Sequence, residues 1–572
     1  MLGKRDKQVD LFDVGNVYPL ALSPSSFYGQ LAAAASRLFA DEDFSVFYSD
    51  KLGRPSVPPT QLALTILLQN YEGVSDHEAV DNTAYDLRWA AVLGKHAGAP
   101  LCAKSTLQLF RAHLILHEEI RNVFIASIKE AKRVGLLKGK ALSIATDTKP
   151  IYGRGALEDT YNLIATGIRQ LSTRLARAKR QMPRDWMKRN ALGRYTEPSV
   201  KGSADIDWSD AAQRQTLLSQ IVSDARRLLA MCAGGEIVSD VLEAAQLLER
   251  LLLQDVQEVA SASGKTEAKI KEGTERDRIP SATDPEQRHG HKSHSRHFTG
   301  HKASVAVETD SQVIAAVEVL PGNAPDATGL MELVEQAEAA TELPVVETIG
   351  DCAYGSGKTR QDFTDAGRTL IAKAPKEPDR GVQFSKSKFQ IDLANGAVSC
   401  PAGCTTSQFH QFPDGRREFY FGKACRKCEL RPICTSAMHG RTILVHPQEA
   451  LLAKARAYQA TPEGQAHLRK RVAVEHRLAR LSQLGIGQAR YVGRAKTLFQ
   501  LMIAATIANL RLAWNFEQAQ NAASKAIRAS CALICAAFCR AIVSLTRTPA
   551  FVIEKPSVLQ PGLEPRIRHE YA

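Results

Sequence analysis

Ala141-Leu-Ser-Ile-Ala-Thr-Asp147 decides the fold, because it is an extended run that predicts a β-strand and ends on a carboxylate. A second such run, Val345-Val-Glu-Thr-Ile-Gly-Asp351, also ends on an aspartate and enters a Gly-containing turn. If the two runs are neighbouring strands, their ends place the two aspartates side by side. Glu475 follows in an Arg-rich helical segment. Two strand-end aspartates and a helix-borne glutamate predict a site for two divalent metal ions that acts on phosphodiesters.

Each of these carboxylates also has a simpler interpretation as a solvated acid at the end of a strand. Arg471 lies one helical turn before Glu475, so the two residues can form a surface ion pair of slight energetic weight. The same arginine is also placed to bind a DNA phosphate. The spacing alone leaves both interpretations open.

The charge of the chain indicates a polyanionic partner. Its 572 residues carry a formal net charge of +13, which favours nucleic acid first and a membrane surface second. Residues 168–194 and 465–515 are strongly basic, and we expect Arg177, Lys179 and Arg180 of the first segment to contact DNA. The alternative is a pair of solvated helix faces.

The composition also suggests a compartment. No apolar run follows the N-terminal residues, so we do not expect a secretory signal. No stretch reaches the ~18 uninterrupted apolar residues of a membrane-spanning helix. We therefore expect a cytoplasmic, nucleoid-associated protein without a membrane partner. In that compartment the eleven cysteines indicate metal binding or free thiols rather than disulfides.

Residues 25–135 have the pattern of a helical domain. Pro58-Pro59 precedes good helix formers over 60–69, and Ser75-Asp-His-Glu78 is a capping box for the next helix. Ser105-Thr106 is expected to cap a further helix over 107–117. Short helices and tight turns fit a helix-turn-helix DNA-binding module, although many helical domains share this pattern.

From residue 141 the pattern becomes α/β. We expect strands over 141–147, 303–308, 313–319 and 345–350, with a helix over about 326–340. The residues between the first two strands predict a helical insertion, because so long a structureless loop is implausible in a compact fold. It comprises a basic helix, a long amphipathic stretch and a polar linker, at 168–191, 211–259 and 261–299.

Several of these segments resemble the DDE transposases of bacterial insertion sequences. The resemblance covers roughly residues 20–515, and its most specific parts are Gly350-Asp-Cys-Ala-Tyr-Gly355 and Arg471-Val-Ala-Val-Glu475. The other similar segments are Gly53-Arg-Pro-Ser-Val-Pro-Pro59, Ala145-Thr-Asp-Thr-Lys149, Phe298–Val307, Val317–Asn323 and Ala508-Asn-Leu510.

The resemblance implies an RNase H-like catalytic core of the mixed α+β class behind a helical N-terminal DNA-binding domain. Asp147, Asp351 and Glu475 would be catalytic and hold Mg²⁺ or Mn²⁺, while Lys149 and Arg471 would contact DNA phosphates. The implied reaction is cleavage at the terminal inverted repeats of an element and strand transfer into target DNA. A homodimer in a synaptic complex is the implied assembly.

The implied domains are 1–138 for DNA binding and 139–520 for catalysis, followed by a tail, 521–572, without an assigned role. The catalytic domain would carry the helical insertion at about 155–299 and a small Cys-rich knuckle at about 396–440. A nuclease that does not join strands and a non-catalytic DNA-binding regulator are the alternatives.

One motif departs from the family. Related transposases often show Tyr-x2-Arg-x3-Glu-x6-Lys around the glutamate. Here Arg471 and Glu475 match, but Leu468 stands at the Tyr position and Ser482 at the Lys position. The departure affects the DNA contacts expected from this helix, not the carboxylates.

Five cysteines between residues 400 and 434 indicate a structural zinc site, because Cys425-Arg-Lys-Cys428 has the spacing of a zinc knuckle. Four thiolates close a tetrahedral site, and we favour Cys404, Cys425, Cys428 and Cys434, with Cys400 as the alternate. A reduced cluster without metal is the other interpretation. Thiolates are poor Mg²⁺ ligands, so the expected role is structural or DNA-contacting.

Two further patterns are less specific. The histidines between His289 and His301 fit no common zinc spacing, so we expect a flexible basic loop ahead of a strand. Cys531, Cys535 and Cys539 recur at helical spacing, which is typical of a buried helical stripe.

Overall fold

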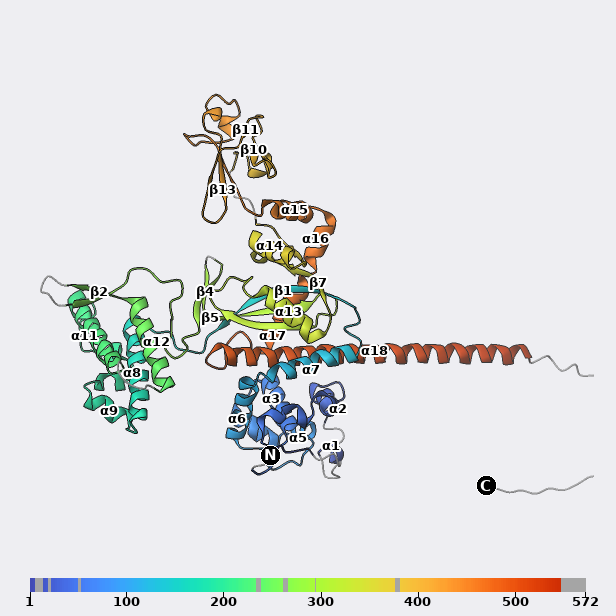
Figure 1. The fold of residues 1–572 in the computed structure, drawn as a ribbon. Helices are drawn as coiled ribbons and strands as arrows, with labels where there is room; N and C mark the ends of the chain where they lie inside the picture. The colour runs from blue at the N-terminus through green and yellow to red at the C-terminus, as the bar shows by residue number, and fades with distance from the viewer. Residues whose placement is uncertain are drawn as a thin grey trace, which may run out of the picture. The chain divides into compact units, whose positions relative to one another are not determined.

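The computed structural model describes residues 1–5, 14–18, 22–49, 53–232, 238–260, 266–293, 295–375 and 381–546. The chain separates into two compact units, Met1–Trp514 and Asn515–Ala572. His294 and residues 547–572 of the predicted tail lie outside the described residues. Figure 1 shows the helices and strands along the chain.

The N-terminal region is helical, as predicted. Its helices are α1 (Val14–Val17), α2 (Phe27–Leu38), η1 (Asp41–Phe47), α3 (Pro59–Glu72), α4 (Asp76–Tyr85), α5 (Leu87–Leu93), α6 (Lys104–Leu116) and α7 (Ile120–Arg133). Proline at the first position begins α3, and Gly73 ends it in the left-handed region with φ 74°. The predicted capping box of α4 is confirmed, because the Ser75 side chain accepts from the Glu78 N–H at 3.2 Å and Glu78 accepts from the Ser75 N–H at 2.8 Å. The predicted cap at Ser105 is wrong, since α6 begins at Lys104 without a side-chain cap.

Glu130 ties these helices together. Its carboxylate is 4% exposed and accepts from Arg37 of α2 at 2.7 Å, from Arg133 at 2.9 Å and from the Trp514 indole at 2.9 Å. Burial raises the pKa of Glu130, but these three donors outweigh it and lower that pKa to about 2. The carboxylate therefore stays ionised and links α2, α7 and Trp514, the last residue of the first unit.

A six-stranded sheet forms the centre of the first unit. Its strands are β1 (Leu142–Tyr152), β4 (Arg288–Ser293), β5 (Arg296–Glu308), β6 (Ile314–Pro321), β7 (Val345–Gly350) and β8 (Thr369–Ala372). The path through the sheet is β4-β5-β1-β7-β8, with β6 also paired to β5. β5 runs antiparallel to β1, whereas β7 is parallel to β1 and β8 is parallel to β7. All four predicted strands are present, and the mixed α+β class is confirmed.

The first strand is longer than predicted. It continues to Tyr152, so Asp147 lies inside β1 rather than at its end. Pro150 is tolerated within this strand because β1 pairs with β7 only over Leu142–Ala145 and that edge of β1 is paired again only at Tyr152, with Gln488, so it is unpaired at Pro150. The other edge stays paired with β5, with Asp147 opposite Val305.

The histidine-containing segment is also more ordered than predicted. Instead of a flexible loop, β4 and the start of β5 form an antiparallel pair, with His289 opposite Thr299 and His291 opposite His297. His301 lies within β5 and is fully buried. The predicted polar linker over 261–299 thus contains β4, the start of β5 and a shorter strand, β3 (Thr266–Ile270).

The insertion between β1 and β4 is helical, as predicted. It contains α8 (Thr160–Ala178), α9 (Pro183–Arg189), η2 (Gly193–Thr196), α10 (Val200–Ser203), α11 (Ala211–Ala230), α12 (Ser239–Asp255) and the hairpin of β2 (Val256–Ala260) with β3. These helices share a core of their own, to which Ile168, Leu171 and Leu248 contribute. The predicted basic helix over 168–191 is wrong in its bounds, because α8 ends at Ala178 and α9 follows after a turn.

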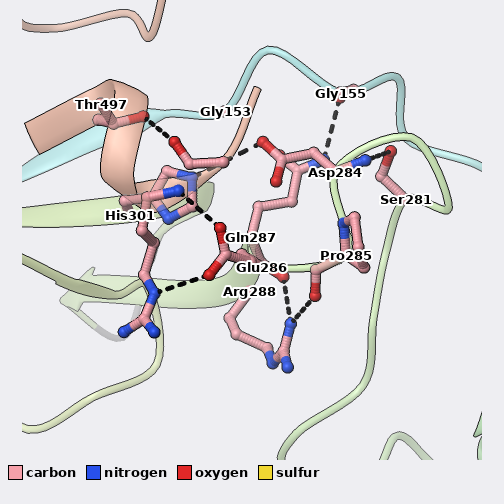
Figure 2. Close-up of polar contacts among 12 residues, drawn as sticks. Gly153, Gly155, Ser281, Asp284, Pro285, Glu286, Gln287, Arg288, His301 and Thr497 are labelled. Carbon is pink, nitrogen blue, oxygen red and sulfur yellow. Dashed lines mark hydrogen bonds and ion pairs between the residues drawn. The ribbon is translucent and has the colours of Figure 1, made fainter. Parts of the chain in front are cut away.

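The insertion leaves and rejoins the sheet at one crowded crossing (Figure 2). A Cβ added to Gly153, just after β1, would lie 1.8 Å from Gln287 Oε1, and one added to Gly155 would lie 2.6 Å from Ser281 Oγ. The Gln287 amide donates to the Gly155 carbonyl at 3.1 Å. Glycine is therefore required where the outgoing segment passes close to the returning one.

The remaining helices and strands come after β6 in the chain. They are α13 (Leu330–Thr341), η3 (Cys352–Tyr354), α14 (Gly357–Asp365), η4 (Lys386–Lys388), β9 (Gln390–Asp392), β10 (Ala397–Ser399), β11 (Thr405–Thr406), β12 (Phe409–Gln411), β13 (Arg417–Tyr420), η5 (Gly422–Cys425), η6 (Arg431–Ile433), β14 (Thr442–Val445), α15 (Glu449–Ala460), α16 (Pro462–Arg469), α17 (Val472–Gln483) and α18 (Arg494–Thr546). β9–β11 and β12–β14 form two small sheets, and the cysteine-rich segment 400–434 lies between β10 and β14 in the chain. The predicted helix over 326–340 is α13, displaced by a few residues.

Helix α18 is apolar over much of its length. By length and composition its Arg494–Phe538 part resembles a membrane-spanning helix, but 83% of its most apolar window is buried within the protein, as in a core helix. Cys531 and Cys535 are exposed, so the predicted buried stripe is wrong for these two residues. The side chain of Cys539 lies outside the described residues.

Candidate active site

The three predicted carboxylates line one open pocket, although they come from distant parts of the chain. Asp147 lies within β1, Asp351 directly follows β7, and Glu475 lies in the first turn of α17. The parallel pairing of β1 and β7 brings the two aspartates together. Helix α17 packs on β1 and β5 and thereby adds the glutamate.

Local structure orients each aspartate. Asp351 caps the short helix η3, because its Oδ1 accepts from the Ala353 N–H at 2.8 Å. Asp147 Oδ1 accepts from the Thr148 N–H at 2.7 Å. The side chain of Glu475 is 46% exposed and that of Asp147 only 21% exposed. The acid on the strand is thus more enclosed than the acid on the helix.

The environment of Asp147 opposes its ionisation. Burial raises the pKa of Asp147, and the nearby carboxylates of Asp351 and Asp326 raise it further, against the Thr148 N–H and the Arg471 guanidinium, which lower it. Several acids sharing one pocket repel one another. A site of this kind is stabilised when positive charge enters it.

Arg471 supplies positive charge to two of the acids. Its Nη1 donates to Asp147 Oδ2 at 3.0 Å, and its Nη2 forms an ion pair with Glu475 Oε1. The pair with Glu475 is the i,i+4 pair expected from the sequence, but the contact with Asp147 crosses from α17 to the sheet. The guanidinium therefore bridges the strand acid and the helix acid.

Lys149 adds a second cation beside the same pocket. Its ammonium contacts the Ser482 hydroxyl of α17, and its pKa is lowered by burial and by the nearby Lys292. Ser482 is the position at which related transposases often carry a lysine. A lysine from β1 thus places its charge beside the residue that departs from the family motif.

The pocket also contains residues that the sequence reasoning missed. Asp326, in the loop after β6, and Lys302, on β5, both line it and form an ion pair of 2.7 Å. His291, Lys292 and Phe298 of the β4–β5 pair line another part of the wall. No periodic pattern marked Asp326, and its only signal was its place in a Pro- and Gly-containing loop after a strand.

The other predicted DNA-binding residues lie elsewhere. Arg177, Lys179 and Arg180 are exposed around the C-terminal end of α8 and do not line the carboxylate pocket. Most of α8 is buried in the core of the insertion. These three cations thus lie at the end of a core helix.

The five clustered cysteines line a single small cavity. Cys400, Cys404, Cys425, Cys428 and Cys434 all border it, and Cys434 is buried. The pKa of the Cys404 thiol is raised chiefly by the neighbouring Cys400, and that of Cys434 chiefly by burial. Neighbouring thiols that suppress one another's ionisation would be stabilised as thiolates by a bound cation.

Neither cluster is arranged around a metal position. In the part of the chain that the structure describes, no group of three or more His, Cys, Asp or Glu side chains is close enough together to hold a metal ion. At the carboxylate pocket the Arg471 guanidinium contacts both Asp147 and Glu475. The donor chemistry of both clusters nevertheless fits a cation, with hard oxygens in one and thiols in the other.

Comparisons with known proteins give two family matches. Residues 399–514, which include the cysteine cluster and Glu475, match the family described as Transposase DDE domain. Residues 21–113, in the N-terminal helices, match the family described as Transposase domain (DUF772). No curated protein and no solved structure matches the chain. The two matches cover parts of a chain whose sheet and α17 bring three carboxylates into one pocket, and together they support a DDE transposase of an insertion element, an enzyme that cleaves DNA and joins it by transesterification.

Proposed function

We propose that this transposase cleaves DNA at the terminal inverted repeats of its element and transfers the freed 3′-hydroxyl ends into target DNA, in two metal-dependent steps at one site. The convergence of Asp147, Asp351 and Glu475 on a single pocket carries the proposal. Both steps displace an oxygen at phosphorus, so one set of acidic residues can serve them in turn.

The proposed catalytic core has the RNase H-like fold. Its support is the strand arrangement, in which β6, β5, β1, β7 and β8 follow one another across the sheet and β5 alone runs opposite to its neighbours. The core would extend over 139–520, with the insertion at about 155–299 and the cysteine-rich knuckle at about 396–440. The DNA-binding domain would occupy 1–138, and the tail, 521–572, has no assigned role.

Asp147 and Asp351 would share one Mg²⁺ or Mn²⁺ ion, and Glu475 would complete the binding of a second. Two such ions activate the attacking oxygen and stabilise the leaving one. Asp147 Oδ1 is held by the Thr148 N–H and Asp351 Oδ1 by the Ala353 N–H, so each aspartate keeps one oxygen oriented. The other oxygen of Asp147 accepts from Arg471, so it would become available to a cation once the guanidinium leaves.

Arg471 would change partners when DNA arrives. In the absence of DNA its guanidinium neutralises Asp147 and Glu475. A phosphate is a competing bidentate acceptor for the same guanidinium, and a cation is the natural replacement at the carboxylates. DNA and metal would thus enter the pocket together. The phosphate would take the guanidinium away from the carboxylates, and the cation would neutralise the carboxylates in its place.

The cations around the pocket would bind the DNA backbone. Lys149 and Lys292 lie near each other beside the acids, and Arg471 faces them from α17. Arg177, Lys179 and Arg180 would form a separate contact with DNA beyond the cleavage point. Contacts of this kind give an affinity that falls steeply as the salt concentration rises.

The cysteine knuckle would bind a structural Zn²⁺ ion. Cys404, Cys425, Cys428 and Cys434 are the proposed ligands, with Cys400 as the alternate, since all five border the same cavity. A bound zinc would fix the two small sheets on either side of the cluster. We further propose that the enzyme acts as a homodimer that holds two element ends in a synaptic complex at the nucleoid.

The test uses the full chain and a duplex that carries the terminal repeat from beside the gene. Wild type should cut this duplex in Mg²⁺ and join it to a target plasmid, whereas Asp147→Ala should bind the duplex with unchanged affinity but neither cut nor join it. Persistent cleavage by Asp147→Ala would overturn the catalytic assignment. Cleavage by wild type without any joined product would show that the protein is a nuclease that does not transfer strands.

A further inference from the structure

The carboxylate pocket contains a fourth acid, Asp326, which does not belong to the predicted catalytic set. It lies in the loop between β6 and α13, and its side chain is 30% exposed and lines the pocket. It is close enough to Asp147 to oppose the ionisation of that residue. A carboxylate beside other carboxylates is destabilised by their repulsion unless a positive charge compensates it.

Tyr354 locates Asp326 relative to the catalytic aspartates. The tyrosine is fully buried, and its hydroxyl makes no hydrogen bond within the described residues, although it lies beside Thr146. After burial, the carboxylates of Asp147, Asp326 and Asp351 are the largest influences that disfavour its ionisation. The same three aspartates line one pocket, which is the observation that groups Asp326 with the other two.

Lys302 holds Asp326 in this position. From β5 its ammonium donates to Asp326 Oδ1 at 2.7 Å and to the Ala324 carbonyl at 2.7 Å. The lysine side chain is only 11% exposed, so its charge is committed to this loop. The Ala324 contact alone fastens the loop to β5, which means that the carboxylate of Asp326 is not needed to anchor it.

The second oxygen of Asp326, Oδ2, makes no hydrogen bond to any of the described residues, and the carboxylate borders an acid-lined pocket. Mg²⁺ usually keeps several of its water ligands in proteins, and carboxylates that accept hydrogen bonds from such waters fix their orientation. Glu475, by contrast, already shares Arg471 with Asp147. Asp326 thus keeps one carboxylate oxygen without a hydrogen bond in the pocket lined by the two aspartates that would hold a cation.

We propose that Asp326, fixed by Lys302, is a positioning residue of the metal site and accepts hydrogen bonds from water molecules on the ion held by Asp147 and Asp351. The proposal rests on the proposed function, because it requires those two aspartates to bind a divalent cation. It assigns to the Lys302–Asp326 pair a role beyond holding the loop. Asp326 does not touch DNA and would act only through the metal-bound waters.

The test measures Mn²⁺ binding to the full chain by electron paramagnetic resonance. Asp326→Asn keeps the size of the side chain and an acceptor for Lys302, and we expect it to weaken Mn²⁺ binding about 10- to 100-fold. Asp362→Asn, at an exposed position on α14, is the matched control and should bind as wild type. In cleavage assays Asp326→Asn should need more Mg²⁺ for half-maximal rate, while its rate at saturating Mg²⁺ recovers toward that of wild type.

A folded Asp326→Asn chain with wild-type Mn²⁺ affinity would overturn the proposal. Asp147→Asn separates this result from failure of the proposed function: if it too leaves Mn²⁺ binding unchanged, the metal site itself is wrongly assigned. Should Asp326→Asn misfold, wild type alone still decides the matter. With Fe²⁺, ascorbate and peroxide, locally formed hydroxyl radicals should cut the backbone near residue 326 as well as near 147 and 351, and cuts near 147 and 351 without any near 326 would refute the role of Asp326.

Discussion

Replacing Arg471 with glutamine should tighten metal binding in the absence of DNA, although it removes a residue that we propose binds a DNA phosphate. The guanidinium bridges Asp147 and Glu475, and a cation can enter between these acids only after both ion pairs break. A glutamine at this position would carry no charge and could not hold the two carboxylates. The apo site would then be open to Mn²⁺ from the start.

The magnitude follows from the exposure of the pairs. The side chains of Arg471, Asp147 and Glu475 are 27%, 21% and 46% exposed, so each pair is closer to a surface ion pair than to a buried one. Pairs of this kind contribute up to about 1 kcal/mol each, and two of them give about 1–2 kcal/mol. Since about 1.4 kcal/mol is a factor of ten, Arg471→Gln should bind Mn²⁺ about 5- to 30-fold more tightly than wild type.

The assay is a Mn²⁺ titration with and without duplex DNA. DNA should tighten Mn²⁺ binding to wild type and have much less effect on Arg471→Gln, because a coupling between two ligands is reciprocal and here passes through this side chain. Arg480→Gln is the control, since Arg480 lies on the same helix, contacts Gln483 and does not line the pocket. Weaker or unchanged Mn²⁺ binding by DNA-free Arg471→Gln would refute the reasoning.

Three further predictions concern the rest of the chain. Glu130→Gln should lower the free energy of unfolding by about 2–3 kcal/mol at neutral pH, and the stabilisation from Glu130 should disappear as the pH falls from about 4.5 toward 2, because its folded pKa is depressed; urea titrations at several pH values measure both effects. Gly153→Ala should lower stability by about 1–3 kcal/mol and expose the insertion to limited proteolysis, whereas Gly487→Ala, where an added Cβ meets nothing within 4 Å, should resemble wild type. Metal analysis should find about one Zn²⁺ per chain, lost in Cys425→Ser and kept in Cys102→Ser; zinc-free wild-type protein with a normal melting temperature would exclude a structural zinc.

The elements that bury apolar side chains in a regular pattern could be predicted from the sequence. The run 345–350 corresponds to β7 without adjustment, and the helix formers after Pro58-Pro59 correspond to α3. The end of β1 could not be predicted. Lys149-Pro150 has the composition of a strand terminus, and only the pairing pattern shows that the proline faces an unpaired edge.

The candidate site likewise has residues that could be predicted from the sequence and residues that could not. Asp147, Asp351 and Glu475 stood in recognisable local settings, and the structure places all three around one pocket. The ion pair between Lys302 and Asp326 joins a strand to a loop beyond the neighbouring strand, so its two residues share no local pattern. The contact of Lys149 with Ser482 likewise depends on how α17 packs against β1. Contacts between distant segments follow from tertiary packing, which a single sequence does not display.

The most direct test of the central claim is a change of metal specificity at Asp147. If this carboxylate binds the catalytic ion, Asp147→Cys should abolish cleavage of the terminal-repeat duplex in Mg²⁺ and recover part of it in Mn²⁺, because a thiolate is a poor ligand for Mg²⁺ and a better one for the softer ion. Asp147→Ala should remain inactive in both metals, since it provides no ligand. Cleavage by Asp147→Cys at the wild-type rate in Mg²⁺ would contradict the assignment of Asp147 as a metal ligand.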